Sequence, residues 1–350
     1  MSFDSRLGRP WTHFDLQKDE WPHASSLVPT NAGPFLFDSD HLVYCLQQSG
    51  YPLEGEEERS QKMALAKALA SPDCLGVVAH GGFGKASFDN LFETFDLTPP
   101  SVIAVHPSAA PPLGPVTAEE EAMLKRLQGR LEPGKLRMLS IDCQPGICEI
   151  GDRKNKAGAA TVLQRARDLG LPYELVMIDR MATRDRSEEC FHVLPRLTRA
   201  ALWRVYGLCD VLLFLTRSEA LGVSLGEGMS HGLVVLASDA PSSPASAEFV
   251  RDGETGFLIN FRRPAVFPEM SDDIDIDQIL NRLSFIATRP EERQAISIRA
   301  ANLFTPFGLH GFRTRNSRIR HLVENGVETA AKAGREWALK ALDASSNVKN

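Results

Sequence analysis

Short, almost entirely apolar runs recur along the second half of the chain, and the stretches between them carry apolar residues at helical spacing. Apolar runs of this length are typical of parallel strands that are buried on both faces, and their alternation with helices predicts a doubly wound α/β domain. The expected strands are residues 136–142, 174–179, 210–215, 233–238 and 256–259. The expected helices include residues 159–169 and 278–287.

The first half of the chain shows the same alternation more weakly. Its pattern predicts strands at 34–38, 75–79 and 102–105, a helix over 58–69, and a strand–helix–strand–helix–strand order that ends near Pro107. An amphipathic helix over 118–131 then leads to Pro133-Gly134, where a turn is expected. We place the boundary between two domains at this turn.

The resulting domain organisation has four parts. They are an irregular segment (1–33), a partial N-terminal Rossmann-like domain (34–133), a C-terminal domain (134–310) and a C-terminal helical segment (311–350). Because only three strands are recognisable between residues 34 and 133, the N-terminal domain is predicted to be reduced.

Composition and charge exclude several classes of protein. The 350 residues are 43% hydrophobic and 24% charged, which excludes a disordered or fibrous chain. The formal net charge is 39 − 45 = −6. This acidic balance argues against a protein whose main task is binding nucleic acid, because such binding depends on clustered Lys and Arg. We therefore expect no nucleic-acid partner.

The cysteines and the hydropathy indicate a reduced compartment. Among the six cysteines, Cys143 and Cys148 are the only close pair, and no second pair completes a tetrahedral zinc site. No apolar run approaches the ~18 residues of a transmembrane helix, and the N-terminus lacks the apolar core of a signal peptide. These features predict a cytoplasmic protein.

The most informative segment follows the expected strand 210–215 and reads TRSEALGVSLGEGMSHGLVVLASD. Glu219 and Glu227 stand with seven residues between them, and Gly222 lies in the loop that joins the strand to the next helix. Such a loop lets the backbone approach a phosphate, and the helix N-terminus offers unbonded N–H groups and a positive dipole end. A diphosphate site is therefore expected here. Glu227 is expected in the first turn of the helix, where its carboxylate can accept hydrogen bonds from sugar hydroxyls.

Each acid also has a simpler interpretation. Ser224-Leu225-Gly226-Glu227 fits the S-x-x-E capping box, in which the Glu only satisfies a backbone N–H. Glu219 taken alone is typical of a solvated loop carboxylate. The two acids, the glycines and the two flanking apolar strands together form a much more specific pattern than either acid alone.

This segment resembles the retaining glycosyltransferases of the GT-B fold, family 4 in particular. Glu219 and Glu227 match the E-x7-E motif of that family, and residues 248–256 resemble its acidic-Val-x-Asp-Gly-x-x-Gly turn. The resemblance implies two Rossmann-like domains and a nucleotide-sugar donor. It implies that Glu219 faces the donor sugar and that Glu227 holds the ribose hydroxyls. The loop backbone at Gly222, Val223 and Ser224 would bind the diphosphate; Ala220 stands where the family usually has glycine.

The resemblance extends to a basic element before the helix 159–169. Arg153-Lys154-Asn155 is similar to the family's Arg and Lys that neutralise the diphosphate leaving group, a charge that grows in the transition state. Arg153 and Lys154 are therefore candidate catalytic residues. Lys156 stays open as the alternative cation, and an exposed basic cluster is the simpler interpretation.

Two further motifs compete with this interpretation. Asp38-Ser39-Asp40 imitates the D-x-D metal site of the other large glycosyltransferase fold, but three residues are a weak signal. The resemblance implies metal-independent transfer without a cofactor. It also makes His41 a candidate donor-binding histidine, and a surface or helix-start histidine is an equal alternative.

The sequence leaves two functions open. The first is a retaining glycosyltransferase that transfers a sugar to an unidentified hydroxyl on a glycan, a lipid-linked sugar or a small molecule. The second is a non-catalytic nucleotide-sugar-binding or scaffold relative that needs a partner chain for the acceptor side. The basic residues of 313–320 leave a peripheral contact with the inner membrane face open, although a solvated helix face is the simpler interpretation.

Overall fold

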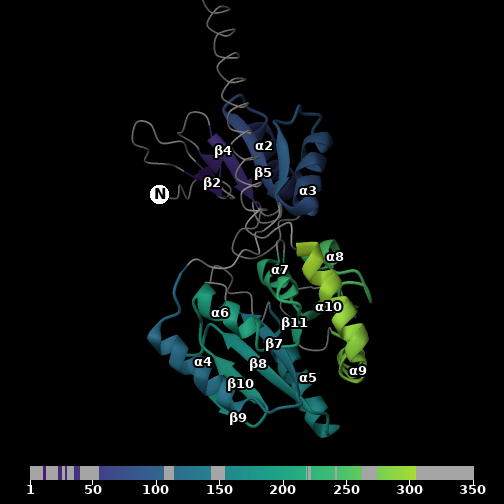
Figure 1. Ribbon diagram of the computed structural model, residues 1–350. Helices are drawn as coiled ribbons and strands as arrows, with labels where there is room; N and C mark the ends of the chain where they lie inside the picture. Colours follow the sequence, from purple (N-terminus) through teal and green to yellow (C-terminus); the bar gives the residue numbers. More distant parts are fainter. Residues whose placement is uncertain are drawn as a thin grey trace, which may run out of the picture. The chain divides into compact units, whose positions relative to one another are not determined.

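The computed structural model of the protein divides into two compact units (Figure 1). Unit 1 comprises Met1–His106 with Arg313–Asn350, and unit 2 comprises Pro107–Phe312. The residues that the structure describes are 11–12, 23–25, 28–29, 35–39, 55–105, 114–142, 154–217, 219, 222–240, 243–261 and 274–304. The predicted helical segment 311–350 and the basic residues 313–320 lie outside them.

Unit 1 contains a four-stranded parallel sheet in the order β2-β4-β5-β6. Its elements are β2 (His23–Ser25), β4 (Phe35–Ser39), α2 (Gly55–Leu69), β5 (Cys74–His80), α3 (Gly81–Thr94) and β6 (Val102–Val105). The core forms where Phe37 packs against Phe88 edge to face, with Leu65 and Leu69 from α2 beside them. The predicted strand–helix–strand–helix–strand order therefore describes most of this unit.

The N-terminal residues contribute strands that the sequence did not predict. The strand β2 pairs with β4 in the main sheet, and β1 (Trp11–Thr12) pairs with β3 (Val28–Pro29) in a separate two-stranded sheet. Strands of two or three residues are too short to show a period of two in the sequence. For this reason the interpretation of 1–33 as irregular was incomplete.

Unit 2 is built on a seven-stranded sheet in the order β13-β12-β11-β7-β8-β10-β9. All neighbouring strands are parallel except β9, which pairs antiparallel with β10. The strands are β7 (Leu136–Asp142), β8 (Tyr173–Asp179), β9 (Arg186–Glu188), β10 (Phe191–Leu194), β11 (Val211–Phe214), β12 (Val234–Ser238) and β13 (Phe257–Ile259). Without β9, this is the 3-2-1-4-5-6 strand order of the Rossmann fold.

Helices cover both faces of this sheet (Figure 1). One apolar layer lies beneath α4, α6, α7 and α8, and the other lies beneath α5 and α9; α10 contributes Ile296 to one layer and Ala300 to the other. The helices are α4 (Ala118–Arg130), α5 (Lys156–Asp168), α6 (Arg199–Tyr206), α7 (Val223–Ser230), α8 (Pro244–Phe249), α9 (Ile276–Thr288) and α10 (Pro290–Phe304). The sheet is therefore buried on both faces, as the continuous apolar runs predict.

The unit boundary differs from the predicted one. The sequence placed it at Pro133-Gly134, whereas α4 belongs to unit 2. The apolar stripe of α4, with Leu124 and Leu127, is buried in the same core as Leu202 and Val205 of α6. Because this stripe has its partner in unit 2, the helix belongs to that unit and the break falls before it.

The part of the chain that the structure describes contains no helix long and apolar enough to cross a membrane. Its cysteines, Cys74, Cys190 and Cys209, are free thiols. Burial raises the pKa of the Cys74 thiol to about 12, which keeps this thiol protonated. The close pair Cys143 and Cys148 lies outside the described residues.

Candidate functional site

The sheet of unit 2 has a topological switch point between β7 and β11. From β7 the chain moves to β8 and then β10 on one side, and it returns to β11 on the other side of β7. The connection after β7 therefore runs toward one edge of the sheet, and the connection after β11 runs toward the other edge. In open parallel sheets, ligands bind beyond the carboxyl ends of the strands at such a switch point. Lys154 follows β7, and Glu219 follows β11.

Lys154 and Glu219 form an ion pair at this switch point. The Lys154 Nζ bonds the Glu219 Oε2, and the side chains are only 10% and 9% exposed. The ammonium also lies 5.5 Å from the centre of the Phe214 ring, over the end of β11. The fold thus brings together two predicted site residues that are 65 positions apart in the sequence.

A glycine joins Glu219 to the helix that follows. Gly222 is the N-cap of α7 and has the left-handed backbone conformation (φ 65°), which is strained for residues with a side chain. Its N–H donates to Glu219 Oε1 at 3.4 Å, so the same carboxylate contacts the lysine and the start of the helix. Val223 and Ser224 are the first two residues of α7. N–H groups at this position of a helix have no acceptor within the helix and suit an anion.

Glu227 lies in the second turn of α7, and the expectation that it lies in the first turn was wrong. The capping-box interpretation was also wrong, because Gly222 and not Ser224 is the N-cap. Glu227 is buried, with 4% of the residue exposed. Its Oε1 accepts from Arg199 Nε at 2.8 Å, and its Oε2 accepts from the Tyr206 hydroxyl at 3.1 Å. No pattern in the sequence indicates either partner.

Asn155 connects the two segments of the site. It has φ 54° at the N-cap of α5, and its Oδ1 accepts from the Gly158 N–H at 3.1 Å and from Arg217 Nη2 at 3.3 Å. Both Asn155 and Arg217 are buried. Asn155 follows Lys154, and Arg217 precedes Glu219 by two positions, so this contact ties the two chain segments together. An Asn directly before a helical pattern is an N-cap signal that would have indicated the first half of this arrangement.

Lys156 has a different environment from Lys154. Its Nζ lies 3.2 Å from Asp142 Oδ2 and 3.0 Å from Asp179 Oδ1, at the ends of β7 and β8. Burial alone would lower the pKa of Lys156, but the bonds to these two carboxylates outweigh burial and raise it. Lys156 therefore stays charged and paired on the β8 side of β7, whereas Lys154 faces Glu219.

The structure does not describe most of the other predicted site residues. Arg153, Asp40 and His41 lie outside the described residues, and Asp38 is in β4 of unit 1. Among the described residues, no three His, Cys, Asp or Glu side chains are grouped so that they could hold a metal ion.

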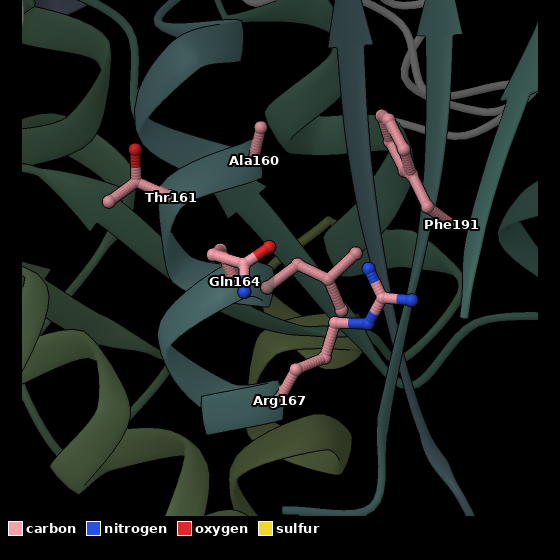
Figure 2. Close-up of a pocket in the computed structure, with 6 residues that line it drawn as sticks. Ala160, Thr161, Gln164, Arg167 and Phe191 are labelled. Carbon is pink, nitrogen blue, oxygen red and sulfur yellow. The ribbon is translucent and has the colours of Figure 1, made fainter. Parts of the chain in front are cut away.

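A hollow of about 350 Å³ lies elsewhere on unit 2, between α5 and Phe191 of β10 (Figure 2). Its lining is mainly apolar, and none of the candidate site residues borders it. Arg167 at its edge is paired with Glu189 of the β9–β10 turn. The candidate site is thus defined by the strand ends and not by this hollow.

A family model matches the segment that contains most of the candidate site. Residues 155–285 match the family model described as glycosyl transferases group 1. The matched range includes Asn155, Glu219 and Glu227 and begins one residue after Lys154. No curated protein sequence matches the chain.

Solved structures show the same fold at low sequence identity. An α,α-trehalose 6-phosphate synthase from Burkholderia multivorans matches with a TM-score of 0.57 and 14% identity, over 86% of this chain and 67% of that one. HepE of Anabaena, solved with UDP and glucose, matches with a TM-score of 0.53 and 12% identity, over 85% and 72%. The GtfA/B complex matches with a TM-score of 0.54 and 12% identity, and this chain spans only 53% of the matched chain. The fold is that of GT-B glycosyltransferases, with two Rossmann-like domains.

Proposed function

We propose that the protein is a retaining glycosyltransferase of the family 4 type, which transfers a sugar from a nucleotide-sugar donor to a hydroxyl acceptor. The observation that carries the proposal is the buried Lys154–Glu219 pair at the switch point of unit 2, beside the glycine-initiated helix α7. The match of residues 155–285 to the group 1 family supports it.

In this proposal the donor diphosphate lies at the N-terminus of α7. The backbone N–H groups of Gly222, Val223 and Ser224 bind its oxygens, and the helix dipole favours its negative charge. Lys154, together with Arg153, the preceding residue in the sequence, neutralises the charge that develops as the nucleoside diphosphate leaves. A cation held in place before the reaction stabilises that charge without reorganisation at the moment of bond breaking.

The two glutamates bind different parts of the donor. Glu219 lies next to both Lys154 and Gly222, and these contacts support a role in which its carboxylate lies beside the sugar–phosphate bond and accepts hydrogen bonds from the sugar. Glu227 lies one helical turn further into α7 and holds the ribose hydroxyls.

The transfer itself needs no separate protein base. The bond between the anomeric carbon and the phosphate oxygen breaks, and the acceptor oxygen bonds to that carbon on the same face. The proton of the acceptor hydroxyl passes to the departing phosphate oxygen. Retention of the anomeric configuration follows from attack on the face that the leaving group vacates.

The acceptor side is proposed to involve unit 1. Its four-stranded sheet is small, and the acceptor is a glycan, a lipid-linked sugar or a small molecule. An acceptor that is linked to lipid would place the protein at the inner membrane face. A scaffold role that depends on a partner chain is the competing function, and it predicts donor binding without turnover.

The test is a screen of UDP, ADP and GDP and their sugars for thermal stabilisation, followed by donor hydrolysis. A ligand at 100 times its Kd stabilises the native state by about 2.7 kcal/mol. We expect one base to stabilise the wild type and its sugar donor to be hydrolysed slowly, with hydrolysis by Lys154→Ala slower by about 10²–10³-fold. Stabilisation without hydrolysis would favour the scaffold, and no stabilisation by any nucleotide would reject the proposal.

Turnover is expected to persist in EDTA, because Lys154 and helix N–H groups take the place of a metal ion at the diphosphate. Complete loss of hydrolysis in EDTA, with recovery on addition of Mn²⁺, would move the assignment to Asp38 and Asp40. The doubly substituted Asp38→Asn/Asp40→Asn variant provides the control, since its activity should equal that of the wild type.

A further inference from the structure

The helix α6 presents three large side chains on one face toward α7. Arg199, Trp203 and Tyr206 are spaced at i, i+4 and i+7, which places them on one side of a helix. Arg199 and Tyr206 each bond a different oxygen of Glu227. A carboxylate oxygen has two lone pairs, so each oxygen keeps a position from which it can accept a hydroxyl proton.

The Tyr206 hydroxyl is held rigidly. The side chain is fully buried, and its ring stacks on His231 with centroids 5.0 Å apart and an interplanar angle of 28°. Trp203 meets the same histidine edge to face at 4.2 Å, and His231 Nδ1 lies 2.8 Å from the Glu227 carbonyl oxygen. The hydroxyl that contacts Glu227 is therefore fixed by packing on α6 and at the end of α7.

The start of α6 is fixed by a carboxylate from α4. Glu120 Oε1 accepts from the Thr198 N–H at 2.6 Å, and Glu120 Oε2 accepts from the Thr198 hydroxyl at 3.0 Å. The same Oε2 accepts from the Thr117 N–H at 3.0 Å, so one buried carboxylate serves the N-caps of both α4 and α6. Burial alone would raise the pKa of Glu120, but these hydrogen bonds lower it overall. The backbone of Arg199, the residue after Thr198, therefore has a fixed position at the start of α6.

We propose that Arg199 and Tyr206 are positioning residues that orient the Glu227 carboxylate for the ribose hydroxyls of the donor. This inference rests on the proposed function. The Glu227 side chain has several rotatable bonds, and two donors from one rigid helix select a single orientation of its carboxylate plane. Arg199 also pairs its positive charge with this almost fully buried carboxylate, which offsets part of the cost of burying the carboxylate.

The experiment compares ribose with deoxyribose ligands. Kd values are measured for UDP, ADP and GDP and for their 2′-deoxy and 3′-deoxy counterparts, with the wild type, Arg199→Gln and Tyr206→Phe. For the base that binds, we expect the wild type to prefer the ribonucleotide by about tenfold, as for the loss of one charge-assisted hydrogen bond. Both variants should reduce this preference to about twofold, mainly by weakening ribonucleotide binding.

Arg204→Gln is the matched control. Arg204 lies on the same helix and pairs with Glu121 of α4, away from Glu227. This variant should keep the wild-type preference. In turnover assays, Arg199→Gln and Tyr206→Phe should raise the donor KM by five- to tenfold with less than a twofold change in kcat.

A merely structural role would give a different result. If either variant weakens ribonucleotide and deoxyribonucleotide binding equally, so that the preference stays near tenfold, the positioning role is wrong. The double variant Glu227→Gln/Arg199→Gln should lose no more preference than Glu227→Gln alone, and additive losses would overturn the inference. A wild type that binds no nucleotide rejects the proposed function, and this inference with it. A wild type that binds the ribose and deoxyribose forms equally, and still hydrolyses its sugar donor, rejects this inference and the ribose-binding role of Glu227 but leaves the proposed glycosyl transfer in place.

Discussion

The ammonium of Lys154 is bonded to the carboxylate of Glu219, and both side chains are about nine-tenths buried (10% and 9% exposed). The cation that is proposed to meet the donor diphosphate is thus already paired within the protein. A diphosphate that enters must share this ammonium with Glu219 or replace it.

This pair predicts an unusual effect of Glu219→Gln. The substitution removes the carboxylate that competes for Lys154 and that repels the diphosphate, so the Kd of the nucleoside diphosphate should fall by about three- to tenfold. Turnover should fall by about 10²-fold, because in the proposed function Glu219 contacts the donor sugar beside the reacting bond. Calorimetric titration and donor hydrolysis measure the two effects. Weaker nucleotide binding in the variant would show that Glu219 and the diphosphate do not compete.

Substitution of Lys154 should mainly lower kcat, whereas substitution of Lys156 should mainly lower the free energy of unfolding. Lys154→Ala should lower kcat by about 10²–10³-fold and change the donor Kd much less, because its interaction strengthens as the diphosphate leaves. Lys156→Ala removes the partner of Asp142 and Asp179 and should lower stability while kcat stays near the wild-type value. Steady-state kinetics and chemical denaturation measure both effects. The reverse pattern would assign the catalytic cation to Lys156.

The sequence predicted the parallel core of unit 2 well because its strands are continuous apolar runs. Residues 136–142 were predicted as a strand and form β7 with the same ends. The strands β9 and β10 were missed for a physical reason. Arg186–Glu188 is polar and exposed at the sheet edge, and β10 has only four residues with His192 buried among them. Neither segment shows the hydrophobic pattern of a strand.

The candidate site was predictable only in part. Lys154, Gly222, Glu219 and Glu227 were identified because their residue types and spacing resemble a known motif. The contacts of Glu227 with Arg199 and Tyr206 could not be predicted, because they depend on how α6 packs against α7. No local pattern links residues that are 28 and 21 positions apart in the chain.

Gly222→Ala should damage the site, whereas the matched substitution Gly134→Ala should not. Gly222 has φ 65°, and a Cβ there would lie 2.9 Å from the Cβ of Ala245. Gly134 has φ 82°, and a Cβ there would meet nothing within 4 Å. Each alanine should cost about 1–3 kcal/mol of backbone strain.

The difference between the two glycine variants lies in ligand binding. Only Gly222→Ala should move the start of α7 and weaken nucleoside diphosphate binding, by about tenfold or more, whereas Gly134→Ala should bind as the wild type does. Denaturation curves and calorimetric titration of both variants test this. Equal nucleotide affinities would mean that the start of α7 does not contact the diphosphate.

The stability of unit 2 should decrease in mild acid because of His192. The side chain is fully buried in β10, and neither ring nitrogen has a hydrogen-bond partner among the described residues. Burial, with a smaller contribution from the charge of Arg130, lowers the pKa of His192 below its ordinary value of 6.5. The unfolded chain therefore binds a proton near pH 6.5 that the folded protein does not bind until a lower pH. Over this interval acid favours unfolding, so stability should fall as the pH is lowered from about 7 through 6.5 and below.

The substitution His192→Leu tests whether His192, and not another titratable group, causes the loss of stability in acid. His192→Leu puts an apolar side chain of similar size in β10, and this side chain cannot bind a proton. Denaturation midpoints are compared between pH 7.5 and pH 5.5, where most carboxylates are still ionised. We expect the midpoint of the wild type to fall over this range and that of His192→Leu to fall less. If the two proteins lose stability in parallel, the proton is bound elsewhere. Glu174 is not its site, because burial raises the pKa of this carboxyl, and a group with a raised pKa stabilises the fold as the pH falls.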